Sequence, residues 1–108
     1  MTQLDISERQ EGGILVLSVA GPINSYTFSE FQEKLDRATA KGSVVIEMEK
    51  VTTLSSAGIG VIMAALDDAE TGGKGLSILR PSEIARLAFE STGFIERFPV
   101  ISSLKDLA

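Results

Sequence analysis

The sequence predicts a single α/β domain with a mixed sheet of four to five strands and about four helices. Two strand-like runs, the first alternating and the second apolar, stand on either side of Gly12-Gly13 and are typical of a β-hairpin. Downstream of this hairpin, helix-like and strand-like patterns alternate, which is typical of parallel strands joined by helices. Because no linker, repeat or low-complexity segment interrupts the 108 residues, we expect one domain over 1–108.

The first part of the chain predicts two strands and a helix. Apolar and polar residues alternate over 4–8. The run over 14–19 is apolar on both faces, so this strand should lie inside the sheet until Gly21-Pro22 ends it. A capping-box pattern at Thr27–Glu30 starts the helix, and Gly42 ends it. Four apolar residues at helical spacing form its predicted buried face: Phe28, Phe31, Leu35 and Ala38.

The middle of the chain predicts a strand over 43–48, a helix over 56–71 and a strand over 76–79. A glycine-rich turn over 71–75 connects the helix to the second of these strands. Residues of the first strand alternate between two faces, with Val44, Ile46 and Met48 on one and Val45, Glu47 and Glu49 on the other. The core stripe of the helix is predicted to be Ile59, Ile62, Met63 and Leu66.

The last part of the chain predicts a helix, a short strand and a final helical turn. Pro81-Ser82 opens the helix, and Gly93 stands where a left-handed residue ends it. A short strand is expected over 95–100, where Pro99 indicates a sheet edge, followed by helical turns over 102–108. The inward face of the helix is predicted to be Ile84, Leu87, Ala88 and Phe89.

Composition excludes several classes of function. A net charge of −5 disfavours binding to nucleic acid or to an anionic membrane. The absence of cysteine excludes disulfides, and the absence of histidine removes the commonest general base and metal ligand. The first residues lack the pattern of a signal peptide, and the longest apolar run, Ala57–Leu66, is about half of what a bilayer requires. We therefore expect a cytoplasmic protein without cofactor or metal.

Two adjacent serines, Ser55 and Ser56, stand at the predicted junction between strand and helix. A helix start uses one hydroxyl as its N-cap, so the second hydroxyl is surplus. One interpretation is plain capping. The other is that Ser56 accepts a phosphate, which the helix would tolerate because its first N–H groups and its dipole favour an anion. Phosphorylation would then change the surface charge without unfolding the domain.

The side of this helix opposite its core stripe is unusual because it carries small or apolar residues where a solvated helix carries charges. Two interpretations are open. Either the helix is buried on most of its sides, or these residues let a partner approach closely beside the serines. The residues concerned are Gly58, Val61, Ala64 and Ala65.

No pattern in the sequence predicts catalysis. Gly72–Gly75 lies between a helix and a strand, whereas a phosphate-binding P-loop requires the reverse order. Ser102–Lys105 has the Ser-x-x-Lys spacing of some acyl enzymes but lacks their companion motifs. The acidic pairs Glu47/Glu49 and Asp67-Asp68 have no predicted cleft around them. We therefore expect a binding protein with no catalytic residue.

The order of the predicted elements, with Leu54–Gly60 at the start of the second helix, resembles a STAS domain and is similar to the stand-alone bacterial anti-sigma factor antagonists. The resemblance extends over most of the chain, through Gly21–Asn24, Val45–Met48 and Phe89–Phe94. The family motif is Asp-Ser-Ser/Thr-Gly-Leu-Gly. Ser55 occupies the aspartate position, Ser56 the phosphoacceptor position and Ala57 the next, and Gly58, Ile59 and Gly60 follow. Two departures, Ser55 and Asn24, remove acidic groups that relatives carry near the switch.

This resemblance implies a partner switch. The unphosphorylated protein would bind an anti-sigma factor, a serine kinase with a histidine-kinase-like ATP fold, and so release the sigma factor. The kinase would phosphorylate Ser56 and end the binding, and a serine phosphatase would reset it. The implied contact residues are Asn24, Ser55, Ser56, Ala57, Gly58 and Val61.

The alternative is an unphosphorylated scaffold subunit of a larger complex, either stressosome-like or part of a lipid-transport machinery. For the partner switch and for the scaffold subunit alike, we expect that the domain by itself is a monomer and is not an enzyme.

Overall fold

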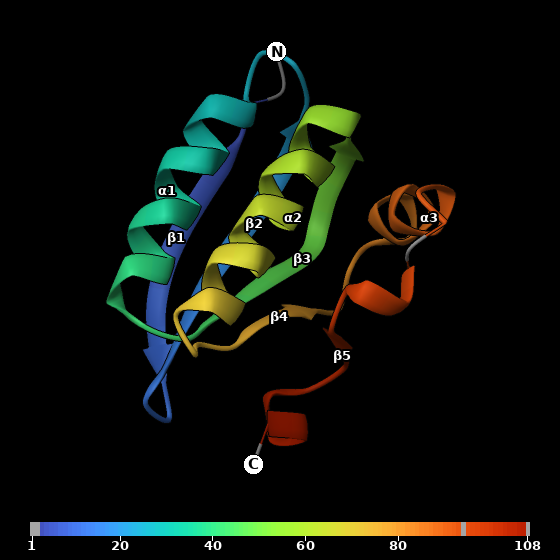
Figure 1. Cartoon of the computed structure of the whole chain (residues 1–108). Coiled ribbons are helices and arrows are strands. Elements are labelled where there is room, and N and C mark those ends of the chain that lie inside the picture. Colours follow the sequence, from blue (N-terminus) through green and yellow to red (C-terminus); the bar gives the residue numbers. More distant parts are fainter. Residues whose placement is uncertain (1–2, 94, 108) are drawn as a thin grey trace.

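Five strands form one mixed sheet in the order β1-β2-β3-β4-β5 (Figure 1). The computed structural model describes residues 3–93 and 95–107. β1 is antiparallel to β2, and each later strand is parallel to the one before it, as the predicted mixed sheet requires. The strands are β1 (Asp5–Glu11), β2 (Ile14–Ile23), β3 (Val44–Leu54), β4 (Leu76–Leu79) and β5 (Val100–Ile101).

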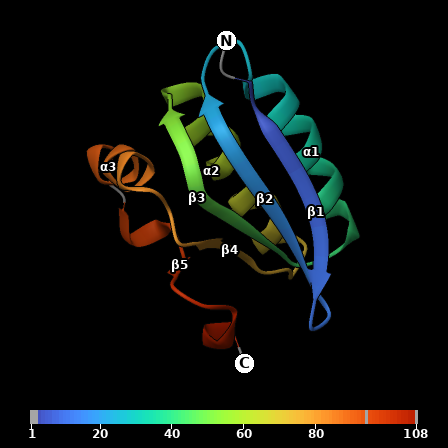
Figure 2. The same cartoon turned by 180° about the vertical axis from the view of Figure 1, so that it is seen from behind.

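The described residues contain three α-helices and two short 3₁₀ helices, against the predicted number of about four. Figure 1 shows α1 and α2 side by side over one face of the sheet, and Figure 2 shows the other face, which no α-helix covers. α3 starts beside β3, where the Ser82 amide donates to the Met48 carbonyl at 3.0 Å. The helices are α1 (Phe28–Lys41), α2 (Ser56–Thr71), α3 (Glu83–Ser91), η1 (Ile95–Arg97) and η2 (Leu104–Leu107).

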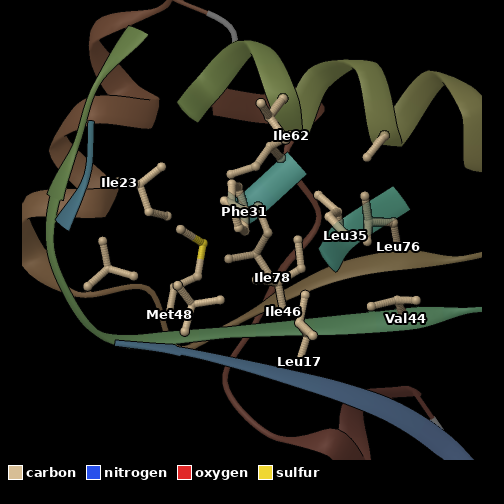
Figure 3. Close-up of a cluster of buried hydrophobic side chains, with 14 of the residues drawn as sticks. Leu17, Ile23, Phe31, Leu35, Val44, Ile46, Met48, Ile62, Leu76 and Ile78 are labelled. Atoms are coloured by element: carbon tan, nitrogen blue, oxygen red, sulfur yellow. The ribbon is translucent and has the colours of Figure 1, made fainter. Parts of the chain in front are cut away.

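The core lies between the sheet and its helices (Figure 3). Leu17, Ile46 and Ile78 are neighbours in register on β2, β3 and β4, and all three are fully buried. Phe31 of α1 and Ile62 of α2 close over them and are equally buried. The predicted faces of the first two helices and of β3 are thus confirmed, with Phe28 and Met63 at the margin as partly buried residues.

Two of the inner strands, β2 and β3, are longer than predicted. β2 continues through Gly21-Pro22, so the prediction that these residues end the strand is wrong. Gly21 has φ = 99°, and a register shift between Gly21 and Pro22 absorbs the irregularity. β1 pairs no further than Ala20, so no strand on that side needs the amide hydrogen that proline lacks. β3 extends to Leu54 because β2 continues alongside it.

The predicted capping box at Thr27 is also wrong, although α1 begins where it was expected. The Thr27 side chain makes no capping hydrogen bond to the helix. Its hydroxyl instead donates to the Pro22 carbonyl at 2.8 Å and accepts from the Asn24 amide at 2.9 Å. A contact back to the extended end of β2 has therefore replaced the local cap.

The C-terminal region differs most from expectation. Ala85 and Phe89 are buried and Ala88 packs against the core, but Ile84 and Leu87 are 52% and 57% exposed. The short helix α3 contacts β3 through the narrow stripe that carries Ala85 and Phe89. The adjacent apolar stripe, with Ile84 and Leu87, stays exposed to solvent.

The predicted strand over 95–100 is wrong except at its end. Residues 95–97 form η1, and only Val100 and Ile101 form β5. Phe98 turns into the core, where its ring centroid lies 4.5 Å from that of Phe89.

Several predictions are confirmed in detail. α2 and β4 have the predicted bounds, and Gly42 and Gly93 follow α1 and α3, with Gly93 in the left-handed region at φ = 77°. η2 lies within the predicted helical segment over 102–108. Phe94 and Ala108, which belong to predicted segments, lie outside the described residues.

Candidate functional site

The predicted site residues come from two loops that meet at one end of the sheet. Asn24 follows β2 and the serine pair follows β3, and parallel strands bring their carboxyl ends to the same edge. The Ser55 amide donates to the Ile23 carbonyl at 2.9 Å, which ties the two loops together. Figure 1 shows the loop after β2 and the start of α2 at this same end of the molecule. The fold thus places Asn24 beside the serine pair.

The two serines have different structural roles. Ser55 is the N-cap of α2, and its Oγ accepts from the Gly58 amide at 3.4 Å. Ser56 is the first residue of the helix and is exposed. Within the described part of the chain its hydroxyl has no hydrogen-bond partner. The prediction that one hydroxyl is surplus is confirmed, and the free one belongs to Ser56.

The loop after β2 is held by the side chain of Asn24, which is half-buried. Its Oδ1 accepts from the Tyr26 amide at 2.8 Å, the Thr27 amide at 3.1 Å and the Thr27 hydroxyl at 3.3 Å. This is an Asx turn, in which the side-chain oxygen replaces a backbone carbonyl. Its amide group donates to none of the described residues, so an N–H donor remains available at the site.

Tyr26, in this loop, is 93% exposed and is not among the residues that the sequence predicts for the site. The available signal was the Asx-turn pattern from Asn24 to Thr27, because such a turn ties down its ends and leaves the side chains between them outside.

Two of the predicted contact residues do not reach the surface. Gly58 and Val61 are buried, as is Ala65, so the structure supports the interpretation in which α2 is buried on most of its sides. A β-carbon on Gly58 would lie 2.5 Å from Ile23 Cγ2, so this glycine lets α2 approach β2. Of the small residues on this side, only Ala64 is exposed. The accessible part of the predicted site is Asn24, Ser55, Ser56 and the half-buried Ala57.

Two of the segments at this end of the domain contain no charged residue, whereas β1, which also starts here, begins with Asp5 opposite Ala20. Residues 21–29 and 51–66 lack Asp, Glu, Lys and Arg altogether, although charged residues make up 23% of the chain. The charged residues that directly adjoin these segments are Glu30, Lys50 and Asp67. A charge added at Ser56 would therefore dominate the local potential.

A polar cluster lies on the face of the sheet away from α1 and α2. The Ser18 hydroxyl donates to Glu47 Oε1 at 2.7 Å, while Arg9 and Arg80 form ion pairs with the same carboxylate at 3.4 and 3.3 Å. The hydrogen bond from Ser18, followed by those from the two arginines, lowers the pKa of Glu47 against the opposing effect of burial. Every carboxylate oxygen of Glu47 is engaged, which is the arrangement of a structural ion-pair network.

The described residues form neither a metal site nor a membrane-spanning helix. Residues 3–93 and 95–107 contain no group of three or more acidic side chains that could hold a metal ion. Over the same ranges, no helix has both the length and the apolar character needed to span a bilayer.

Comparison with known proteins assigns the family. The family model of the STAS domain matches residues 5–107. An anti-sigma factor antagonist from Mycobacterium paratuberculosis has 22% identity and a TM-score of 0.85, over 96% of this chain and 90% of that chain. The anti-sigma factor antagonist SpoIIAA in its unphosphorylated form has 16% identity and a TM-score of 0.71, over 99% of this chain and 93% of that chain. The Bacillus cell fate determinant SpoIIAA in its phosphorylated form has 15% identity and a TM-score of 0.67, over 99% of this chain and 96% of that chain. Both the sequence match and the shared fold lead to one conclusion: this chain belongs to the STAS domain family.

Proposed function

We propose that this protein is an anti-sigma factor antagonist whose binding is switched off by phosphorylation of Ser56. The observation that carries the proposal is the division of roles at the start of α2. Ser55 performs the capping, so the exposed Ser56 hydroxyl has no structural duty. Membership of the STAS family and the likeness to structures named as anti-sigma factor antagonists support the same function.

In the unphosphorylated state, Ser56 and its neighbours bind an anti-sigma factor, which then releases its sigma factor. The anti-sigma factor is a serine kinase with a histidine-kinase-like ATP fold. It transfers the γ-phosphoryl group of ATP to Ser56 Oγ, which loses its proton, and ADP leaves. A serine phosphatase hydrolyses the phosphoester and regenerates the serine and inorganic phosphate. The antagonist itself acts in the cytoplasm as a monomer and catalyses neither step.

The geometry explains why such a modification would alter binding without unfolding the domain. Phosphate brings about −1.5 to −2 charges at neutral pH. At the first residue of α2, the free N–H groups and the helix dipole favour an anion, so the fold tolerates it. The surrounding segments carry no cation, so the new charge has no side-chain counter-ion within residues 21–29 or 51–66. A partner surface shaped for the neutral site would then have to desolvate an unpaired anion.

The test is a pull-down from native lysate of the source organism with wild-type, Ser56→Asp and Gln10→Glu proteins. Gln10→Glu is the control, because it adds a negative charge at an exposed position of β1, near the hairpin at the other end of the sheet (Figure 1). We expect the wild type and the control to retain a histidine-kinase-like ATPase, and Ser56→Asp to bind it at least about tenfold more weakly. The thermal midpoints of all three proteins should agree closely.

Other outcomes would contradict the proposal. If wild type and Ser56→Asp retain the same multi-subunit complex, the domain is a scaffold subunit and Ser56 is no switch. If the retained ATPase transfers no phosphate from radiolabelled ATP to the wild type, while Ser56→Ala also binds normally, the phosphorylation step is wrong.

A further inference from the structure

Tyr26 is the most exposed large hydrophobic residue of the described part of the chain, at 93%. An aromatic side chain buries about 150–250 Å² when it is covered, which is a large gain for one residue. Tyrosine is enriched at protein interfaces and among the few residues that dominate binding energy. Its position in the loop after β2 places it at the same end of the molecule as Ser56.

The loop holds Tyr26 in place before any partner arrives. The Tyr26 amide donates to Asn24 Oδ1 at 2.8 Å, and the amide of Phe28 donates to the Asn24 carbonyl at 2.9 Å. The Thr27 hydroxyl joins the loop to the Pro22 carbonyl at 2.8 Å. The backbone on both sides of Tyr26 is therefore fixed, and only two side-chain torsions remain to be ordered on binding. Such preorganisation lowers the entropic cost of association.

The surroundings of Tyr26 define the kind of surface that it fits. Segments 21–29 and 51–66 carry no charged side chain, and Glu30 and Asp5 lie at their margin, so a strongly charged partner surface would find few ion pairs here. What these segments offer is one exposed phenol ring, hydroxyl groups, and the free amide group of Asn24. A complementary surface is uncharged, hydrogen-bonding, and contains an apolar pocket of the size of a phenol ring.

We propose that Tyr26 is the anchor residue of the interface at Ser56, and that its ring enters an apolar pocket on an uncharged surface of the partner protein. The identity of the partner as an anti-sigma factor rests on the proposed function; the anchor role rests on the exposure and fixation of Tyr26. The anchor role of Tyr26 and the phosphorylation of Ser56 together account for the switch. A phosphate on Ser56 would stand at the rim of the partner's pocket, where no cation would receive it. Affinity before phosphorylation is therefore nearly independent of ionic strength.

The chain carries its own probe for this interface, because Tyr26 is its only tyrosine and it has no tryptophan. Protein labelled with 3-fluorotyrosine gives one ¹⁹F resonance, which reports on this ring alone. The protein that the wild type retains from lysate is identified by mass spectrometry, purified and titrated into the labelled chain. Affinities are measured in parallel by calorimetry for wild type, Tyr26→Phe, Tyr26→Ala and Leu107→Ala. Leu107→Ala is the matched control, because Leu107 is an exposed apolar residue of η2, at the far end of the domain from the loop (Figure 2).

We expect the ¹⁹F resonance to shift on binding, and Tyr26→Ala to weaken binding at least about 30-fold. Tyr26→Phe should lose no more than about tenfold, and Leu107→Ala should bind like the wild type. The wild-type dissociation constant should change less than about threefold between about 50 and about 500 mM salt. Because Tyr26 is almost fully exposed, its two variants should unfold at nearly the same urea concentration as the wild type.

The outcomes separate this inference from the proposed function. If the retained protein is an anti-sigma factor but Tyr26→Ala binds it as tightly as the wild type, the anchor role is wrong and the function stands. If the retained protein is of another class and its binding depends on Tyr26, the anchor role stands and the function is wrong. If the ¹⁹F resonance is unmoved by a partner that Ser56→Asp no longer binds, or if the wild type retains nothing, the anchor role fails.

Discussion

Gly58 and Ile23 are packed so closely that a β-carbon on Gly58 would lie 2.5 Å from Ile23 Cγ2. The same β-carbon would lie 2.8 Å from Leu54 Cδ1, so the first turn of α2 rests on the last residues of both β2 and β3. This contact, together with the hydrogen bond from the Ser55 amide to the Ile23 carbonyl, fixes the start of α2 beside the loop of Asn24. The site geometry therefore depends on a glycine that no partner can touch.

Gly58→Ala should destabilise the fold by about 1–2 kcal/mol. Overpacking of a buried site costs about 1–3 kcal/mol, and the better helix propensity of alanine offsets up to about 1 kcal/mol of that. Ile23 is fully buried and branched at Cβ, so it has little room to move. The control is Gly60→Ala in the same helix, where nothing lies within 4 Å of an added β-carbon. It should stabilise by up to about 1 kcal/mol in urea unfolding; equal effects of the two substitutions would contradict the packing argument.

Alanine substitutions of the two adjacent serines should differ in their effect on stability. Ser55→Ala removes the N-cap and should lower the free energy of unfolding by about 0.5–1 kcal/mol, toward the low end of capping effects because the hydrogen bond is long at 3.4 Å. Ser56→Ala should change it by less than about 0.5 kcal/mol, as is usual for an exposed side chain without such a contact. Urea unfolding of both variants measures this. A larger loss for Ser56→Ala would mean that Ser56 has a structural role.

Asn24 offers a test of the loop. Asn24→Ala removes the oxygen that accepts from the Tyr26 and Thr27 amides and should cost about 1–2 kcal/mol. Asn24→Asp keeps that oxygen and restores the acidic group expected from the family pattern, so the stability should stay within about 0.5 kcal/mol of wild type. Hydrogen exchange of the Tyr26 and Thr27 amides should accelerate in Asn24→Ala only. Acceleration in both variants would show that the oxygen alone does not hold the loop.

Buried and exposed apolar residues of α3 should differ in how much they contribute to stability. Phe89→Ala should cost about 3–5 kcal/mol, because its buried ring packs against that of Phe98. Leu87→Ala, on the exposed stripe of the same helix, should change stability by less than about 0.5 kcal/mol. Calorimetric or urea unfolding distinguishes them. A loss of several kcal/mol for Leu87→Ala would mean that the exposed stripe is covered in solution.

Sequence patterns predicted α2 completely, and the reason is local. Its start carries the capping serine, its residues from Ala57 to Leu66 are all apolar or small, and Gly72 follows its end. The alternation of β3 likewise identified the buried face before the structure placed it. These features depend on residues close in sequence, so periodicity is enough to find them.

The errors arose where contacts outside the element itself decide. α3 carries two adjacent apolar stripes, and only its packing on β3 selects Ala85 and Phe89 over Ile84 and Leu87. The Thr27 hydroxyl had a capping partner in its own helix available but donates to the Pro22 carbonyl, in a strand that extends further than predicted. The exposure of Tyr26 follows from the same loop. Structural context thus overrode local preference in α3 and in the loop after β2.

The polar cluster around Glu47 predicts a pH dependence of stability. The hydrogen bond from Ser18 and the ion pairs with Arg9 and Arg80 lower the pKa of Glu47 in the folded state. The unfolded carboxyl has a pKa of about 4.3, so it binds a proton more readily than the folded one. The stabilisation is therefore fully present above about pH 4.3, and it is lost as the pH falls through the lower, folded value.

Glu47→Gln should accordingly be less stable than wild type at neutral pH, and the difference should shrink as the pH falls below about 4.3. Glu49→Gln is the matched control, because Glu49 is on the same strand and pairs with the same Arg80, but at 3.8 Å and with 61% of its side chain exposed. Solvent screening of that pair should leave its effect below about 1 kcal/mol at any pH. Urea unfolding of the three proteins at neutral and acidic pH gives both differences. A Glu47→Gln deficit that is constant with pH would assign the effect to altered packing instead of the carboxylate charge.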